Sequence, residues 1–222
     1  ITFVDIAGLV KGASKGEGLG NKFLSHIREV DAIIHLVRCF ESDKITHVNS
    51  AINPLNDLET IKTEIILSDI DIIQKKLEKG KKKLLSEKEI KILERKLEEL
   101  NQGKDQSAEN EDENKFLSSI GLLSIKPKII VCNIDEKNLA TGNKFTESVK
   151  SKYSNEKIVT ICADIEDQIM GLDKNERETF MKEIGLNKTG LNQLIREGYD
   201  LLELNTFFTS GPEESRAWTI KK

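Results

Sequence analysis

The fold is decided by the opening stretch ITFVDIAGLVKGASKGEGLGNKF, residues 1–23. The run from Ile1 to Val4 is mostly apolar and β-branched, which is typical of a buried strand, and Asp5 stands at its end. A carboxylate at the carboxyl end of a parallel strand points into the crevice where α/β proteins bind ligands. Gly8 follows three residues later, so that a backbone N–H can approach a phosphate while Asp5 holds Mg²⁺. The stretch predicts a nucleoside-triphosphate sensor loop, although this short spacing also fits an Asp that only caps a turn.

Three further runs resemble the first. Ala32–Cys39, Lys128–Asn133 and Lys157–Cys162 are apolar and continuous rather than alternating. Continuous runs indicate parallel strands that are covered on both faces. Helical spacing between and after the runs predicts helices around Leu24–Val30, at Phe145–Tyr153, after Asp173 and at Leu191–Leu202. Strands that alternate with helices predict an α/β fold with a parallel sheet.

A long interruption, roughly ninety residues, separates the second run from the third and far exceeds an ordinary crossover. Leu58–Leu77 and Ile90–Leu100 keep helical spacing, which predicts an inserted antiparallel coiled-coil hairpin. Gly80 and Lys81–Lys83 form its basic tip, which is either solvated surface or a contact for RNA. The polar stretch Asn101–Asn114 is expected to be a mobile loop.

Composition excludes several classes of protein. The formal net charge of −4 argues against general adhesion to nucleic acid or anionic lipid. The apolar runs have strand length, so we expect no transmembrane helix and no membrane partner. Cys39, Cys132 and Cys162 form no Cys-x-x-Cys pair and are interpreted as reduced, buried thiols rather than a metal site. With no secretory signal visible, a cytoplasmic protein is predicted.

Longer motifs resemble the Obg-like ATPase family, the YchF branch of the translation-factor-related P-loop NTPases. The matching motifs are DIAGLVKGASKGEGLGNKFLSHIREVD (5–31), AIIHLVRCFES (32–42), DKITHV (43–48), CNIDE (132–136), ICADIE (161–166) and FFTSGPEESRAWTI (207–220). They occur in the family's order and leave out only the variable middle of the insert. The resemblance implies a protein that binds ATP, and GTP less well, hydrolyses ATP with Mg²⁺, and couples nucleotide state to the ribosome or translation machinery.

The resemblance also assigns roles on the phosphate side. Asp5 is implied to hold Mg²⁺, and Gly8 to contact the γ-phosphate. Leu9 stands where most GTPases carry a water-orienting glutamine. A leucine cannot orient water by hydrogen bonding, so hydrolysis must use another group or be slow. His47, in a polar segment, is either a catalytic contributor near the γ-phosphate or a surface histidine.

On the base side, Asn133 and Glu136 correspond to the family's Asn-x-x-Glu motif, which replaces the Asn-Lys-x-Asp of most GTPases. This change weakens guanine recognition, and the exocyclic amine of adenine can instead donate to a backbone carbonyl such as that of Ile134. Cys162 and Ala163 occupy the place of a further base-side loop and are implied to contribute through their backbone. Without the resemblance, ordinary loop polarity would explain Asn133 and Glu136.

The resemblance divides the chain into a nucleotide-binding domain (1–52 and 125–203), the helical insert (53–124) and the start of a β-grasp TGS domain (204–222). The segment SGPEE between two apolar runs predicts a hairpin there. The phosphate-binding pattern Gly-x-x-x-x-Gly-Lys-Ser/Thr does not occur in the 222 residues, and in the family it precedes the Asp-x-x-Gly strand. The chain is therefore expected to be the middle of a family member, with an incomplete sheet and no ATPase activity of its own.

Two alternatives stay open at this point. The first is a non-catalytic module that binds RNA or protein through the coiled-coil insert. The second is a GTPase with relaxed base specificity. A reading frame that continues upstream through a phosphate-binding loop would favour the ATPase.

Overall fold

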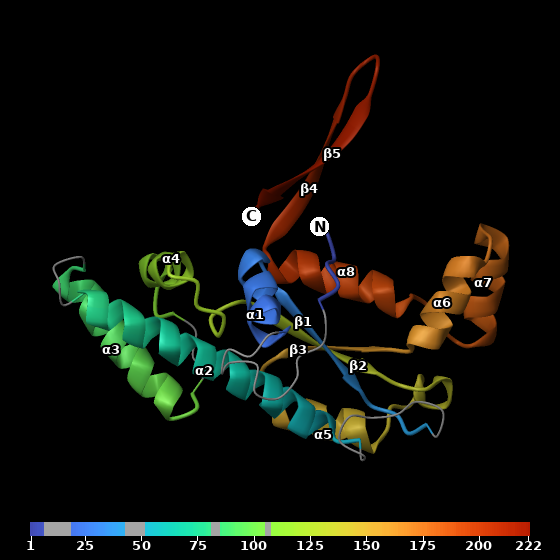
Figure 1. Cartoon of the computed structure of the whole chain (residues 1–222). Helices are drawn as coiled ribbons and strands as arrows, with labels where there is room; N and C mark the ends of the chain where they lie inside the picture. Colours follow the sequence, from blue (N-terminus) through green and yellow to red (C-terminus); the bar gives the residue numbers. More distant parts are fainter. Residues whose placement is uncertain (7–18, 43–51, 81–84, 105–107) are drawn as a thin grey trace. The chain divides into compact units, whose positions relative to one another are not determined.

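The parallel sheet has the strand order β1-β2-β3, formed by β1 (Ile33–Arg38), β2 (Lys128–Asn133) and β3 (Lys157–Ile161). The computed structural model describes residues 1–6, 19–42, 52–80, 85–104 and 108–222. Val37 lies opposite Cys132, and Val131 lies opposite Val159, so all three strands run in the same direction (Figure 1). The predicted α/β class with a parallel sheet is confirmed.

The prediction of a strand at Ile1–Asp5 is wrong, because residues 1–6 form no regular secondary structure. Ile1, Phe3 and Val4 are 47%, 48% and 57% exposed. Among the described residues, the parallel ladders run from β1 to β2 and from β2 to β3. Strand propensity reflects a fit to a pleated, half-buried surface. These residues have the propensity but pair with no neighbouring strand.

The two faces of the sheet carry different helices. On one face Ile129, Val131 and Val159 pack against Leu194 of α8 (Gly190–Leu201). Figure 1 shows α5 (Lys144–Lys152) on the opposite side of the sheet. The predicted helices at Phe145–Tyr153 and Leu191–Leu202 are thus confirmed within one or two residues.

Helix α8 does not cover the whole of its face. Ile34 and Leu36 of β1 share that face through their pairing with Ile129 and Val131, and they remain 38% and 60% exposed. The continuous apolar pattern of β1 therefore overstates its burial, because α8 contacts β2 and β3 instead.

Two helices follow β3. Helix α6 (Ala163–Gly171), which the sequence analysis missed, packs on α7 (Lys174–Glu183) through Ile165 and Ile169. The capping box predicted after Asp173 is confirmed, because the Asp173 carboxylate accepts the Glu176 N–H while the Glu176 side chain accepts the Asp173 N–H.

The chain divides into two compact units. The sheet unit comprises Ile1 with 32–57 and 127–222, and the helical unit comprises 2–31 and 58–126. The helical unit contains α1 (Leu19–Glu29), most of α2 (Pro54–Gly80), α3 (Glu87–Asn101) and α4 (Glu111–Ser119). The helices predicted for the insert are confirmed, whereas Lys81–Lys83 at its tip lie outside the described residues and the family-based domain boundaries stay a prediction.

The helical unit has its own apolar core. Ile73 of α2, Leu93 and Leu100 of α3, and Leu117 of α4 are at most 1% exposed and form one cluster. Ser86 begins α3 with a capping box that includes Glu89, which fixes the start of the helix.

The prediction of a mobile loop at Asn101–Asn114 is wrong at its end, where α4 begins at Glu111. The Asn110 side chain accepts the Glu113 N–H and caps this helix, and Leu117 anchors it in the core. The polar residues at the end of this segment therefore belong to the solvent-facing first turn of a helix and not to a loop.

A buried carboxylate fixes the return of the chain after α4. Asp69 of α2, fully buried, accepts the N–H groups of Leu123 and Ser124 at 2.8 to 3.0 Å. Nearby, Arg28 Nη2 donates to Ser68 Oγ at 3.0 Å, joining α1 to α2. Lys126 Nζ donates to the carbonyl oxygen of Arg28, in the last turn of α1. The last carbonyl groups of a helix have no partner within the helix, and Lys126 supplies one of them with a donor.

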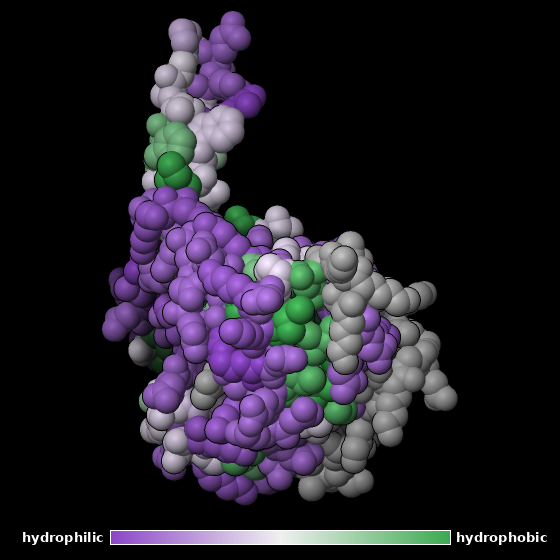
Figure 2. Space-filling view, turned by 90° about the vertical axis from the view of Figure 1, so that its left-hand side faces the viewer, coloured by the Kyte–Doolittle hydropathy of each residue, from purple (hydrophilic) through white to green (hydrophobic). Residues whose placement is uncertain are grey.

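The predicted C-terminal hairpin is confirmed as β4 (Leu204–Ser210) and β5 (Ser215–Lys221), with Phe207 opposite Trp218. Trp218 Nε1 donates to Thr209 Oγ1 at 2.8 Å. Both rings are about half exposed, and Figure 2 shows hydrophobic residues on the surface of the hairpin. No helix within the described ranges has the length and apolar character that a bilayer span requires.

Candidate functional site

Four of the predicted base-side residues meet where β2 and β3 end. Asn133, the last residue of β2, accepts the backbone N–H of Ala163 on its Oδ1 at 3.0 Å. Ile134 donates its N–H to the carbonyl oxygen of Ile161 at 2.9 Å. The Ile134 side chain is 1% exposed, so only its backbone can take part in recognition. The structure thus brings the CNIDE and ICADIE motifs together at the carboxyl edge of the sheet.

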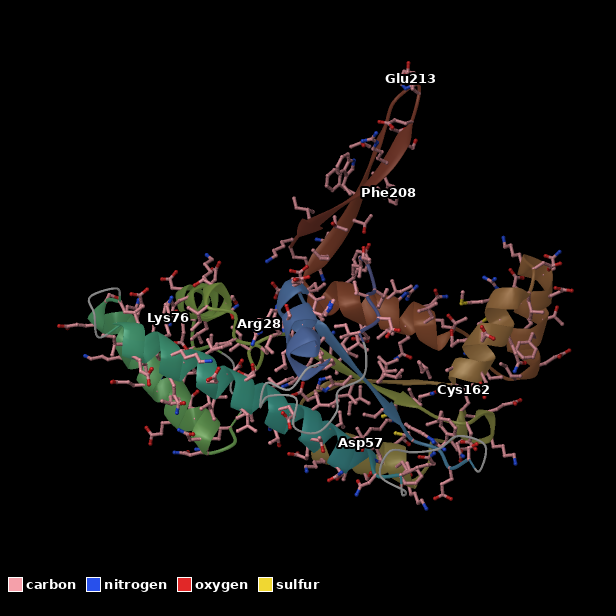
Figure 3. The ribbon with its side chains drawn as sticks, in the orientation of Figure 1. Arg28, Asp57, Lys76, Cys162, Phe208 and Glu213 are labelled. Carbon is pink, nitrogen blue, oxygen red and sulfur yellow. The ribbon has the colours of Figure 1, made fainter. Side chains whose placement is uncertain are left out.

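Cys162 begins α6 without capping it in the usual way. It stands at the N-cap, and its side chain makes no capping hydrogen bond. Asn133 supplies the missing acceptor from the neighbouring strand, because its Oδ1 takes the Ala163 N–H. Burial raises the pKa of the Cys162 thiol, which is labelled in Figure 3 and is 1% exposed.

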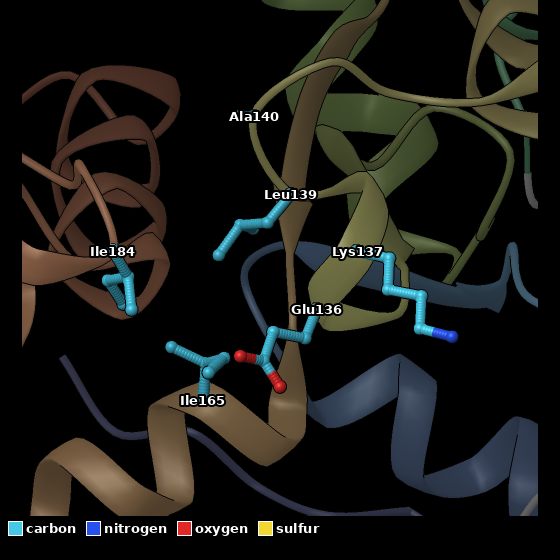
Figure 4. Close-up of a pocket in the computed structure, with 6 residues that line it drawn as sticks. All are labelled: Glu136, Lys137, Leu139, Ala140, Ile165 and Ile184. Carbon is cyan, nitrogen blue, oxygen red and sulfur yellow. The ribbon is translucent and has the colours of Figure 1, made fainter.

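A cavity of about 390 Å³ opens beside this edge. It is lined by Glu136, Lys137, Leu139, Ala140, Ile165 and Ile184. Glu136 begins the short helix η2 (Glu136–Asn138), and Figure 4 shows its carboxylate pointing toward Ile165 while the Lys137 side chain points away from Leu139 and Ile184. Apolar walls with one carboxylate suit a flat heterocycle that carries a hydrogen-bond donor.

The phosphate-side residues fall elsewhere in the chain. Asp5 is exposed and belongs to the helical unit, whereas Asn133 and Glu136 belong to the sheet unit. Gly8, Leu9 and His47 lie outside the described residues, and their predicted roles stay predictions.

The side chains available as metal ligands can be compared with the needs of the implied Mg²⁺. In the part of the chain that the structure describes, no group of three or more His, Cys, Asp or Glu side chains could hold a metal ion. Mg²⁺ commonly takes one or two carboxylates and completes its shell with water and substrate phosphates. The single exposed carboxylate of Asp5 fits that mode of binding.

One residue that the sequence analysis missed fixes the end of β1. Asn143 caps α5 by accepting the Phe145 and Thr146 N–H groups, and its Nδ2 donates to the carbonyl oxygen of Cys39 at 2.6 Å. The sequence carries a signal for the cap, because Asn143 and Thr146 have capping-box spacing. The bond to Cys39 joins positions 104 residues apart, and no local pattern indicates it.

The three thiols lie near the carboxyl ends of the three strands and are at most 1% exposed. A hydrogen bond between the Cys39 and Cys132 thiols, together with burial, raises the pKa of Cys39 above its usual range. The prediction of reduced, buried cysteines is confirmed.

We expect all three thiols to resist modification in the native chain. Reaction requires an exposed thiolate, so each cysteine must wait for the fold to open and should react at about one-thousandth of its denatured rate or less. Titration with Ellman's reagent at pH 8, with and without urea, measures this. Rapid reaction of even one thiol in native buffer would contradict the observed burial.

Comparison with known proteins identifies relatives of this chain. The family model described as a 50S ribosome-binding GTPase matches residues 1–100. The ribosome-binding ATPase YchF of Bacillus subtilis is 43% identical over 232 aligned positions, which cover 99% of this chain and 63% of the relative. The protein of the same name from Escherichia coli O157:H7 is 45% identical, with 98% of this chain and 62% of the relative covered.

A solved structure supports the same relationship. The YchF GTPase of Schizosaccharomyces pombe matches with a TM-score of 0.81 and 30% identity, covering 96% of this chain and 61% of that one. The fold is thus that of a P-loop NTPase, as predicted. The chain spans somewhat more than three-fifths of the length of these relatives.

Proposed function

Because this chain belongs to the YchF family, we propose that the protein containing it is a Mg²⁺-dependent ATPase that binds the ribosome and works in the cytoplasm. The observation that carries this proposal is the bond between Asn133 and Ala163 beside the cavity that Glu136 lines, in a chain whose relatives are named ribosome-binding ATPases. ATP would be hydrolysed to ADP and phosphate, and GTP would be a poorer substrate.

The base would be recognised by this edge. Asn133 holds the start of α6 in place, so that Cys162 and Ala163 form one wall of the base site. The Ile134 N–H is already bonded to Ile161, which leaves its carbonyl oxygen as the group proposed to accept the exocyclic amine of adenine. Glu136, exposed beside the cavity, offers a second acceptor for N–H groups. The two hydrogens of adenine's exocyclic amine could donate to these two acceptors, with the ring against the apolar wall.

The phosphates would be handled by the opening stretch. Asp5 would hold Mg²⁺, which neutralises charge on the phosphate oxygens when bound. The N–H of Gly8 would contact the γ-phosphate, and Leu9 would keep a hydrophobic side chain where other enzymes orient water. His47 is the proposed proton-accepting or water-orienting group. These four roles rest on the family motifs and on the exposure of Asp5.

The helical insert is the proposed coupling element. Its core is built from residues of the helical unit, and the two long helices of that unit would present a packed surface to the ribosome. Contact with RNA would fall at the lysine-rich tip, Lys81–Lys83. A purely non-catalytic interaction module would use the same surface and is the outcome if no hydrolysis is found.

The test uses the full-length gene product and calorimetric titration with ATP and with GTP. We expect tighter binding of ATP, and we expect Asn133→Ala to weaken ATP binding about tenfold, because the wall formed by Ala163 loses its anchor. Asn175→Ala, at an exposed position of α7, is the matched control and should leave the affinity unchanged.

Two results would contradict the proposal. Tenfold tighter binding of GTP would overturn the assignment of adenine to this edge. An absence of phosphate release from ATP, with and without ribosomes, would overturn the ATPase and favour the interaction module.

A further inference from the structure

A carboxylate joins the first turn of α6 to the beginning of α8. Glu166 accepts the Gly190 N–H on Oε1 at 2.6 Å and the Leu191 N–H on Oε2 at 3.2 Å. These two N–H groups belong to the first turn of α8, where no intrahelical acceptor exists. A negative charge is also favoured there by the helix dipole. Thr189 caps the same helix by accepting the Asn192 N–H. Glu166 therefore accepts the two N–H groups of the first turn that Thr189 does not.

The joint is close as well as charged. A Cβ added at Gly190 would lie 2.6 Å from Ile161 Cγ2 and 3.1 Å from Glu166 Oε1. Real side chains do not approach that closely, so Gly190 is needed for α8 to reach both the end of β3 and the first turn of α6. A side chain added at position 190 would therefore push against both Ile161 and Glu166.

The same turn of α6 carries the proposed base-side wall. Ala163 is the first residue of α6, and Glu166 lies in the same turn, three positions further along the chain. Ala163 is bonded to Asn133 of β2, while Glu166 is bonded to α8. The start of α6 is thus held from two sides, by Asn133 toward the sheet and by Glu166 toward α8.

We propose that Glu166 is a positioning residue for base recognition, which holds the Cys162–Ala163 wall at the distance that a purine requires. This inference rests on the proposed nucleotide-binding function. Glu166 acts through Ala163 and makes no contact with the nucleotide. Its loss would leave the first turn of α6 held by the Asn133 bond and by the packing of Ile165, with no bond to α8. Recognition of the base would then weaken, while recognition of the phosphates would not.

The test compares two carboxylates that cap helices in the same unit. Glu166→Gln keeps the size of the side chain but removes the charge and turns one acceptor into a donor facing an N–H. Glu176→Gln does the same in the capping box of α7 and is the matched control. Each full-length variant is titrated by calorimetry with ATP, with GTP and with inorganic tripolyphosphate, which has no base.

We expect Glu166→Gln to raise the Kd for ATP about three- to tenfold, because the hydrogen bonds from Gly190 and Leu191 to a charged carboxylate are weakened. The Kd for tripolyphosphate should stay unchanged. Glu176→Gln should change neither Kd, although it should lower the melting temperature to a similar extent. Gly190→Ala disturbs the same contact from α8 without a change of charge, because the added methyl group would meet Ile161 and Glu166. It should also raise the Kd for ATP and leave the Kd for tripolyphosphate unchanged. This second variant keeps the inference testable if Glu166→Gln does not fold.

Several outcomes would overturn the inference. One is a Glu166→Gln variant that melts earlier but binds ATP within twofold of the wild type. Another is an equal loss of affinity for ATP and for tripolyphosphate. A wild-type protein that binds neither ATP nor GTP would overturn the proposed function itself, and the inference with it.

Discussion

Replacing Leu93 by Asp is expected to unfold the helical unit while leaving the sheet unit intact. Leu93 is fully buried in the cluster that joins α2, α3 and α4. An aspartate there would lose the packing of the leucine and bury a carboxylate without a partner, which costs about 4 kcal/mol or more. That loss is a large share of the stability of a unit of this size.

Hydrogen exchange followed by mass spectrometry measures this for each segment. The amides of α2 and α3 should lose their protection, while those of β2 and β3 should keep theirs. Leu67→Asp is the matched control, because Leu67 lies on α2 and is 42% exposed, and its replacement should change stability by only about 0.5 kcal/mol. Normal protection and unchanged helical circular dichroism in Leu93→Asp would refute the helical core.

Replacing Asp69 by Ala is expected to lower the unfolding free energy of the same unit by about 3 kcal/mol. The Asp69 carboxylate accepts the N–H groups of Leu123 and Ser124, and all three groups are buried. Its removal leaves two backbone donors without an acceptor, and each such group costs about 1–3 kcal/mol. Urea unfolding monitored by circular dichroism gives the difference.

The pH dependence of stability separates the charge of Asp69 from its hydrogen bonds. Burial raises the pKa of Asp69 above its ordinary value of 3.8, despite the two N–H donors and the charge of Arg28, which lower it. The folded state therefore binds a proton more tightly than the unfolded state does. This contribution to stability is complete below pH 3.8 and is lost as the pH rises through the pKa of the folded state.

Asp69→Asn cannot ionise, so the decline in stability above pH 3.8 should be smaller in this variant than in the wild type. Unfolding in urea at a series of pH values from 3 to about 7 supplies the two curves, and their difference isolates position 69 because the other carboxylates are common to both proteins. Parallel curves would show that Asp69 titrates alike in the folded and unfolded chain, contrary to its burial.

Local patterns predicted much of this fold. The strands at Lys128–Asn133 and Lys157–Ile161 and the start of α7 were found because a continuous apolar run and a capping box are local features. Helix α6 was missed because Cys162 is not a usual capping residue, and its substitute, Asn133, comes from another strand. The strand expected at Ile1–Asp5 failed because propensity does not supply a partner.

In the candidate site, too, the residues with local signals were predicted and those that depend on tertiary contacts were not. Asn133 and Glu136 were identified because a family motif spans a few adjacent residues. The contacts of Glu166 with Gly190 and Leu191 join residues more than twenty positions apart, and nothing in either segment alone indicates that they meet. The sequence shows which side chains can accept hydrogen bonds, but only the tertiary structure shows which donors reach them.

The burial of all three cysteines has a practical consequence for spectroscopy. A single cysteine introduced at an exposed position such as Lys76 of α2 would be the only sulfhydryl that a maleimide dye or nitroxide could reach in the folded chain. Site-specific fluorophores or spin labels can therefore be attached to the native background, without a cysteine-free template that would alter the ends of β1, β2 and β3.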